Sequence, residues 1–214
     1  MLYPKLPYSP ERDLRPVTVM GSFPMILAVN PSVPANSVHE LVAMSKKPGQ
    51  QVTYSTASVA FQVATEMLKQ MSGANLYNVP YKGRNQEMMA VLGSDVQMVI
   101  LDGALLLLHM QSGKLKALEV TSPKRISLYP SLPTVAESGV SGYALEFWVD
   151  LFAPAKTPVE IVNKVQAEVV RIMQKPDVCE KLAKLGIEAR GGEMIRAEAV
   201  RFAAIIKKAG ITEE

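Results

Sequence analysis

The central part of the chain alternates between short continuous apolar runs and longer segments in which apolar residues recur at helical spacing. Continuous runs are typical of strands covered on both faces, and the recurring pattern is typical of amphipathic helices. The order therefore predicts an α/β sheet. The expected strands are 17–20, 25–29, 52–54, 76–80, 96–101 and 115–120, and the expected helices between them are 38–44, 60–71, 85–92 and 104–110.

Proline and glycine punctuate this pattern. Residues 1–16 hold four prolines and are expected to form an extended lead-in, because proline donates no backbone hydrogen bond. The Gly21-Ser22-Phe23-Pro24 segment separates two strands and suggests a chain passing from one lobe to another. Ser37 is expected to cap the first long helix, with Glu40 completing a capping box.

The last third of the chain has a different character. A short helix is expected over 134–138, and residues 143–152 alternate between aromatic and acidic positions. Beyond Pro158 the pattern predicts amphipathic helices at 159–174 and 177–185. A brief strand over 187–189 and a final helix over 197–209 complete the expected elements.

Small and polar residues follow the strand at 52–54. The turn Ser55, Thr56, Ala57 and Ser58 leads into the helix at 60–71, so the first amides and the dipole of that helix point back at the turn. An anion is favoured at such a place in an α/β sheet. The alternative is a plain helix N-cap, which is the common use of Ser and Thr before helices.

Two further groups follow the neighbouring strands. Tyr81, Lys82 and Gly83 bring a hydroxyl, a cation and a flexible turn to the end of the strand at 76–80. Lys82 is a candidate for a ligand carboxylate or simply a solvated residue. Asp102 ends the strand at 96–101 and is either a group that orients the ligand or the N-cap of the helix at 104–110.

Composition excludes several classes of protein. The 23 Lys and Arg against 20 Asp and Glu give a net charge of +3 without a basic cluster, which argues against nucleic acid. Cys179 cannot form an internal disulfide and is expected to be a part-buried thiol. His39 and His109 lie far apart, so spacing supports neither a metal set nor a catalytic triad. We therefore expect no enzyme, no metal and no cofactor.

The order of these pieces resembles the substrate-binding proteins of tripartite tricarboxylate transporters, the Bug-type periplasmic receptors. Single pieces such as Pro-Tyr-Lys-Gly are weak signals, whereas the whole set in its order is specific. The segments that carry the resemblance are Leu2–Tyr8, Pro16–Val19, Val29–Ala35, Lys47–Gly49, Val79–Gly83, Gly113–Leu118, Thr121–Arg125, Leu132–Gly139 and Leu151–Pro158.

The resemblance implies a type II periplasmic-binding-protein fold of two lobes that captures a small di- or tricarboxylate and delivers it to membrane permease subunits. Residues 24–149 would form the second lobe, and 1–23 with 150–214 the remainder of the first. The crossing strands would be 19–25 and 148–153. The implied location is periplasmic. The substrate-binding residues expected on this basis are Ser55, Thr56, Ala57, Ser58, Tyr81, Lys82, Gly83 and Asp102.

The chain departs from the family pattern in three places. No signal peptide and no first Gly-rich loop precede Leu2, so the first lobe is expected to be incomplete. The turn after Tyr54 lacks glycine, and Gln62 stands where family members carry histidine. The C-terminal helix is shortened. An alternative function is therefore a ligand-sensing or interaction module that dimerises through the surface a full first lobe would cover.

Overall fold

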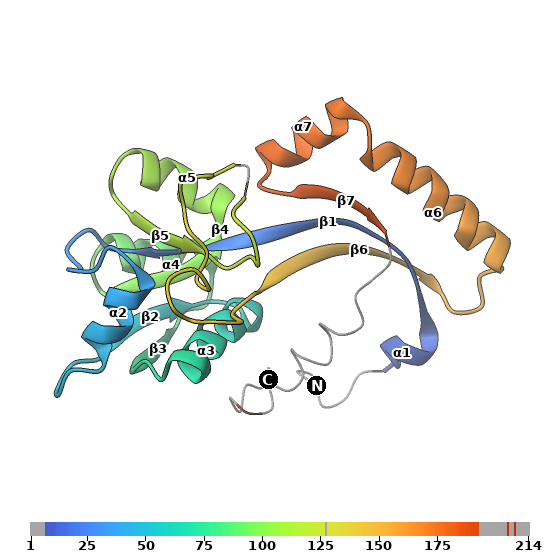
Figure 1. The fold of residues 1–214 in the computed structure, drawn as a ribbon. Helices are drawn as coiled ribbons and strands as arrows, with labels where there is room; N and C mark the ends of the chain where they lie inside the picture. The colour runs from blue at the N-terminus through green and yellow to red at the C-terminus, as the bar shows by residue number, and fades with distance from the viewer. Residues whose placement is uncertain (1–6, 127, 193–204, 206–207, 209–214) are drawn as a thin grey trace. The chain divides into compact units, whose positions relative to one another are not determined.

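The computed structural model describes residues 7–126 and 128–192, together with Ile205 and Lys208 (Figure 1). Its internal contacts divide the chain into two compact units. Unit 1 comprises the described parts of 1–23 and 147–214, and unit 2 is Pro24–Glu146. The helix expected over 197–209 lies almost wholly outside the described residues.

Unit 2 is built on a mixed sheet. The strand order is β3 (Leu76–Pro80), β2 (Val52–Thr56), β4 (Met98–Asp102), β1 (Leu14–Val29) and β5 (Lys116–Val120), with the segment of β1 from Pro24 onward in this unit. Strand β2 runs parallel to β3 and β4, whereas β1 runs antiparallel to β4 and β5. The carboxyl ends of β2, β3 and β4 therefore share one edge.

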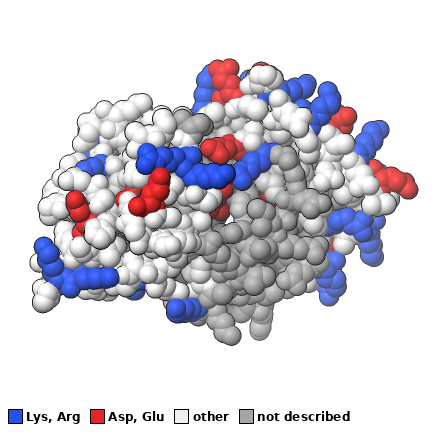
Figure 2. Space-filling view, viewed as in Figure 1, with Lys and Arg blue, Asp and Glu red and all other residues white. Residues whose placement is uncertain are grey.

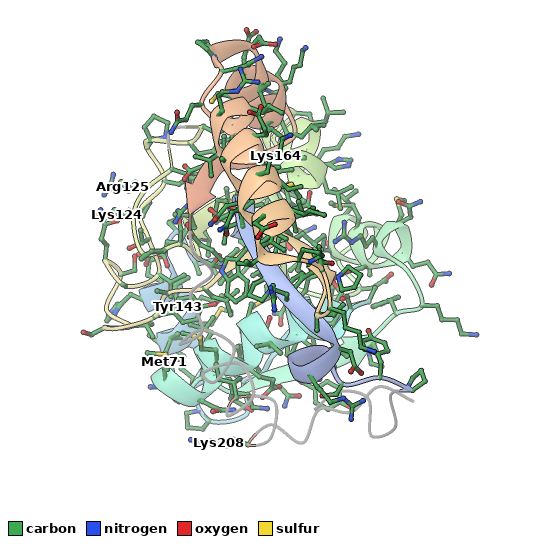
Figure 3. All side chains as sticks on the ribbon, turned by 90° about the vertical axis from the view of Figure 1, so that its right-hand side faces the viewer. Met71, Lys124, Arg125, Tyr143, Lys164 and Lys208 are labelled. Carbon is green, nitrogen blue, oxygen red and sulfur yellow. The ribbon has the colours of Figure 1, made fainter. Side chains whose placement is uncertain are left out.

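Four helices accompany the strands of unit 2: α2 (Val38–Ser45), α3 (Val59–Ser72), α4 (Arg84–Leu92) and α5 (Gly103–Gln111). The expected Ser37 cap of α2 is confirmed, because the Ser37 hydroxyl accepts a hydrogen bond from the Glu40 amide at 3.1 Å. The Glu40 carboxylate accepts from the Asn36 amide at 2.7 Å, one residue before the position that a capping box requires. Gly73 ends α3 in the left-handed conformation at φ 67°. Tyr143, labelled in Figure 3, donates its hydroxyl to the carbonyl of Ala64 on α3. The Tyr143 hydrogen bond links α3 to the segment that precedes β6.

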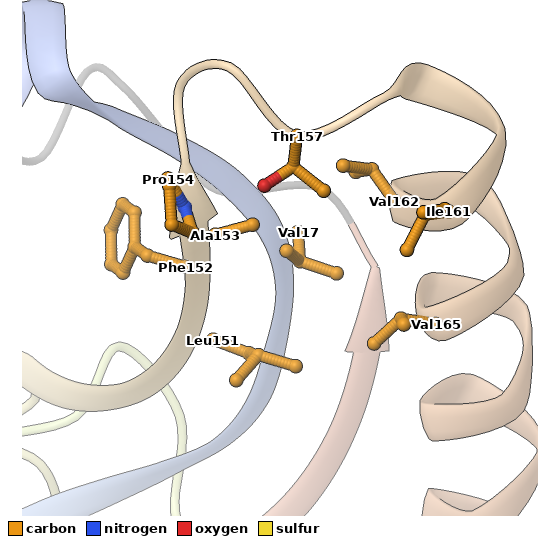
Figure 4. A pocket seen from close by; sticks show the side chains of 9 residues that line it. All are labelled: Val17, Leu151, Phe152, Ala153, Pro154, Thr157, Ile161, Val162 and Val165. Carbon is orange, nitrogen blue, oxygen red and sulfur yellow. The ribbon is translucent and has the colours of Figure 1, made fainter.

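Unit 1 pairs β6 (Glu146–Pro154) and β7 (Glu188–Gly192) with the first part of β1. Helices α1 (Pro10–Asp13), α6 (Val159–Met173) and α7 (Pro176–Lys184) complete it. An apolar pocket of about 260 Å³ lies between β1, β6 and α6 (Figure 4). Lys164 lies on an exposed part of α6 (Figure 3). The pocket is lined by Val17, Leu151, Phe152, Ala153, Pro154, Thr157, Ile161, Val162 and Val165.

Three expectations from the sequence are wrong. The Gly21 to Pro24 segment does not break the strand, because β1 runs from Leu14 to Val29 without interruption. The lead-in contains the short helix α1 and the start of β1 rather than only extended chain. Residues 134–138 form hydrogen-bonded turns rather than a helix.

Gly21 explains how β1 stays continuous. A side chain there would bring its Cβ to 2.6 Å from Ile187 Cγ2 and 2.9 Å from the Glu188 carbonyl. Gly21 pairs with Ala189 of β7, so the glycine admits close approach of the neighbouring strand rather than a turn. Gly21 is therefore required for close packing of β7 on β1 and not for a turn. Its position shortly before Pro24 is typical of a turn, which is why the sequence predicted one.

The surface carries charges of both signs close together. On the face shown in Figure 2, Lys and Arg side chains lie beside Asp and Glu side chains among the described residues. In the described part of the chain, no helix combines the length and the apolarity that a membrane span requires. Cys179 is part-buried, as expected, and its thiol lies 3.2 Å from the Met173 carbonyl.

Candidate functional site

The turn after β2 joins a buried strand to the N-terminus of α3. Ser58 has the extended backbone of an N-cap, but its side chain makes no capping hydrogen bond. The Ser58 side chain therefore does not cap the first amides of this 14-residue helix, and the positive end of the helix dipole lies at the turn. Ala57 and Ser58 are half-buried, which leaves part of the turn open to solvent. The turn provides the electrostatics that an anion needs.

Ser55 and Thr56 have structural partners. The Ser55 hydroxyl lies 3.3 Å from the Glu87 carbonyl, and the Thr56 hydroxyl donates to the Asn78 side-chain oxygen at 2.7 Å. Both residues are buried. Their hydroxyls tie β2 to α4 and to β3, so ligand contact at this turn falls first to Ala57 and Ser58.

The residues after β3 lie next to this turn. The Tyr81 amide donates to the Thr56 carbonyl at 2.7 Å, which extends the pairing of β2 and β3 beyond the strands. Lys82 is exposed and has no hydrogen bond or ion pair with any other described residue. Gly83 is the N-cap of α4 with extended backbone. Lys82 and Gly83 line an open hollow of about 440 Å³ with Arg84, Asn85 and Gln86.

Asp102 is the N-cap of α5, which is one of the two roles expected for it from the sequence. Its Oδ1 accepts from the Leu105 amide at 3.1 Å, and its Oδ2 lies 3.2 Å from the Arg84 guanidinium. The carboxylate is thus engaged on both oxygens. Asp102 therefore caps α5 and also influences the position and charge of Arg84.

Arg84 is a site residue that sequence reasoning missed. Its guanidinium lies 4.7 Å from the ring centroid of Phe61, in the first turn of α3, while it pairs with Asp102 at the end of β4. This arrangement brings a half-exposed cation to the first turn of α3. The signal in the sequence was its place as the first helical residue after Tyr81-Lys82-Gly83.

Glu87 is the second residue that sequence reasoning missed. It lies one turn into α4, is fully buried, and neither carboxyl oxygen makes a hydrogen bond. The pKa of Glu87 is raised to about 7. Burial is the largest cause, and the charge of Asp102 also raises the pKa, whereas the charge of Arg84 and the nearby Ala57 amide lower it. In the sequence, Glu87 closes the polar run Arg84-Asn85-Gln86-Glu87, which is typical of a solvated helix face.

The structure therefore brings the three predicted groups to one edge, formed by the carboxyl ends of β2, β3 and β4 (Figure 1). Their roles in binding remain predictions. Among the described residues, no group of three or more His, Cys, Asp or Glu side chains lies close enough to hold a metal ion. The edge offers helix amides, an arginine and a lysine, a set that suits an anion.

Comparison with known proteins places the chain in a family. Residues 1–211 match the family model described as the tripartite tricarboxylate transporter family receptor, TctC. The chain is 29% identical to protein BugT of Bordetella pertussis over 98% of this chain and 67% of BugT. It is 27% identical to a UPF0065 protein from the tcbD-tcbE intergenic region of Pseudomonas sp. strain P51 over 95% of this chain. The chain spans 63% of that relative's length.

Several solved structures are similar to this chain over almost its whole length. Rpa4515 of R. palustris with adipate has a TM-score of 0.84 at 30% identity, covering 99% of this chain and 73% of that one. The periplasmic binding protein BugD gives 0.80 at 29% identity, over 100% and 75%. MatC of Rhodopseudomonas palustris with bound malate gives 0.72 at 25% identity, over 98% and 71%.

These matches confirm the α/β periplasmic-binding-protein fold and the resemblance on which the prediction was based. They also support the expectation of a protein that is not an enzyme, because the family is one of receptors. The chain belongs to the family of tripartite tricarboxylate transporter receptors.

Proposed function

We propose that this chain is a solute receptor that binds a small organic carboxylate at the edge formed by β2, β3 and β4. Family membership and the adipate and malate bound to two of the similar structures support this class of ligand. The observation that carries the proposal is the position of Arg84 over Phe61, beside α3 amides that lack a side-chain cap.

The binding step follows from charge and geometry. A ligand carboxylate at Ala57 and Ser58 receives backbone donors and the helix dipole, which contributes about 0.3–1 kcal/mol at an exposed site. Arg84 adds a guanidinium with five donors, of which one nitrogen is bonded to Asp102. Lys82 supplies a second cation from the same hollow. Asp102 offsets part of this positive charge, which favours a site that also releases its ligand.

The remaining roles in this proposal come from the family. The receptor delivers its carboxylate to the membrane permease subunits of a tripartite tricarboxylate transporter and works in the periplasm. BugD, described as a periplasmic binding protein, supports that location. The alternative is a ligand-sensing module or an interaction module that dimerises. Sedimentation velocity distinguishes this alternative from the receptor, because a strict monomer counts against the alternative.

Titration calorimetry with a panel of adipate, malate, succinate and citrate tests the function. The proposal expects saturable heat with at least one member, and acetate as a monocarboxylate control gives the contribution of a single anion. If no member of the panel gives a heat of binding with a chain that circular dichroism shows to be folded, carboxylate binding by this chain is rejected.

A further inference from the structure

Glu87 is a buried acid whose carboxyl lacks a hydrogen-bond partner. The whole residue is inaccessible to solvent, and both of its carboxyl oxygens are unsatisfied. Most buried polar side chains in folded proteins have a hydrogen-bond partner, so an unsatisfied carboxyl calls for an explanation. A purely structural role is poorly served by a group that costs free energy to bury.

The carboxyl lies beside the turn where the ligand is proposed to bind. The backbone of Glu87 is tied to that turn through the Ser55 hydroxyl. Its carboxyl faces the Ala57 amide, whose pull on the ionised form lowers the Glu87 pKa. That contact falls short of a hydrogen bond. The chain's own carboxyl and the proposed ligand carboxylate therefore both act on the Ala57 amide.

Two other charged groups act on Glu87. Arg84, on the same helix, favours the ionised form, whereas Asp102, at the end of β4, disfavours it. Arg84 and Asp102 also pair with one another, so their effects partly cancel. The protonation of Glu87 is thereby left sensitive to a further negative charge that arrives at the turn.

We infer that Glu87 makes carboxylate capture at the Ser55–Ser58 turn proton-coupled: the turn accepts a ligand carboxylate while Glu87 is protonated and disfavours it while Glu87 is ionised. This inference rests on the proposed function and adds the condition under which the site fills. An ionised Glu87 attracts the Ala57 amide from inside the fold and repels a second anion. A neutral Glu87 leaves the Ala57 amide and the charge of Arg84 to the ligand.

The linkage has a definite sign. At a pH above the free-state pKa of about 7, binding takes up a proton at Glu87, so the dissociation constant rises with pH. Below that pH Glu87 is already neutral and the dissociation constant levels off. Between pH 6 and 8.5 the affinity for adipate should fall about thirtyfold.

Calorimetric titration of the full chain with adipate at pH 6.0, 7.0 and 8.5, in two buffers of different ionisation enthalpy, tests the coupling. Wild type should lose affinity as pH rises and take up close to one proton per adipate at pH 8.5. Glu87→Gln should bind equally at all three pH values without proton uptake. Glu119→Gln, which alters a buried acid beside Val38 on α2, should keep the wild-type profile.

Each outcome is decisive. A Glu87→Gln profile that matches wild type overturns the inference and leaves the proposed function standing. Absence of adipate binding at every pH from folded wild type overturns both. If Glu87→Gln does not fold, carbon-13 NMR of the wild-type carboxyl decides, because adipate should raise the midpoint of the Glu87 titration. An unchanged midpoint at saturating adipate rejects the coupling.

Discussion

The Arg84 guanidinium lies 3.2 Å from the Asp102 carboxylate and at the same time over the ring of Phe61, 4.7 Å from its centroid. One cation thus connects the first residue of α4, the end of β4 and the first turn of α3. At a half-exposed position an ion pair alone contributes little to stability. The main effect of the ion pair is to position the guanidinium, because Asp102 and the Phe61 ring together limit where it lies.

Replacing Arg84 should therefore affect binding more than folding. Arg84→Met keeps an apolar contact with Phe61 but removes the charge, and we expect adipate affinity to fall on the order of tenfold, the equivalent of one charge-assisted hydrogen bond. Calorimetry measures the change. Arg125→Met is the matched control, because Arg125 forms an exposed pair with Glu137 elsewhere in unit 2. Equal losses in both variants would contradict a specific role for Arg84.

Two substitutions of Asp102 separate its capping role from its pairing role. Asp102→Asn retains an N-cap for α5 and releases Arg84, so stability should stay within about 0.5 kcal/mol while adipate affinity rises severalfold. Asp102→Ala also removes the cap and should lower the free energy of unfolding by about 1 kcal/mol. Urea denaturation and calorimetry measure the two effects. Weaker binding by Asp102→Asn would contradict this expectation and show that the Asp102 carboxylate assists binding, either by contact with the ligand or by holding Arg84 in place.

Glu87 should also set part of the pH dependence of stability. Its pKa is about 7 in the folded chain and 4.5 in the unfolded one, so its protonated form is favoured by folding. The contribution is fully present below pH 4.5 and is lost as pH rises to 7, a loss on the order of 3 kcal/mol. Urea denaturation across this range should show wild type falling relative to Glu87→Gln. Parallel curves would mean that Glu87 titrates normally.

The two glycines Gly21 and Gly83 make a matched pair. Gly21→Ala forces a Cβ against Ile187 and the Glu188 carbonyl and should cost about 1–3 kcal/mol. Gly83→Ala meets no atom within 4 Å and has an extended backbone, so it should lose only the preference for glycine over alanine at an N-cap, about 1 kcal/mol or less. Thermal unfolding of both variants checks the contrast. A tolerated Gly21→Ala would mean that β7 is able to shift away from β1.

Sequence patterns predicted the repeating elements well where one face of each is buried. Helix α3 and the strands at its two ends follow directly from apolar periodicity, because burial dictates that spacing. The continuity of β1 was missed because Gly21 and Pro24 are typical of turns, and only the approach of Ile187 shows why glycine is there.

The candidate site was predictable in position but not in its charges. Strand ends and the turn Ser55–Ser58 could be located from the sequence, since parallel strands share an edge. Arg84 and Glu87 sit in a polar helical run that gives no sign of which residue faces inward. In the structure, Arg84 is a cation over the ring of Phe61, and Glu87 is a buried acid. The packing of α4 on β2 decides which of the two faces inward.

Backbone amide shifts in nitrogen-15 NMR, followed while adipate is titrated at pH 6, test the central claim most directly. The account predicts saturable shifts that are largest at Ala57, Ser58 and Arg84, with one dissociation constant for all three. Saturable shifts confined to residues away from the ends of β2, β3 and β4, or none at all in the folded chain, would contradict it.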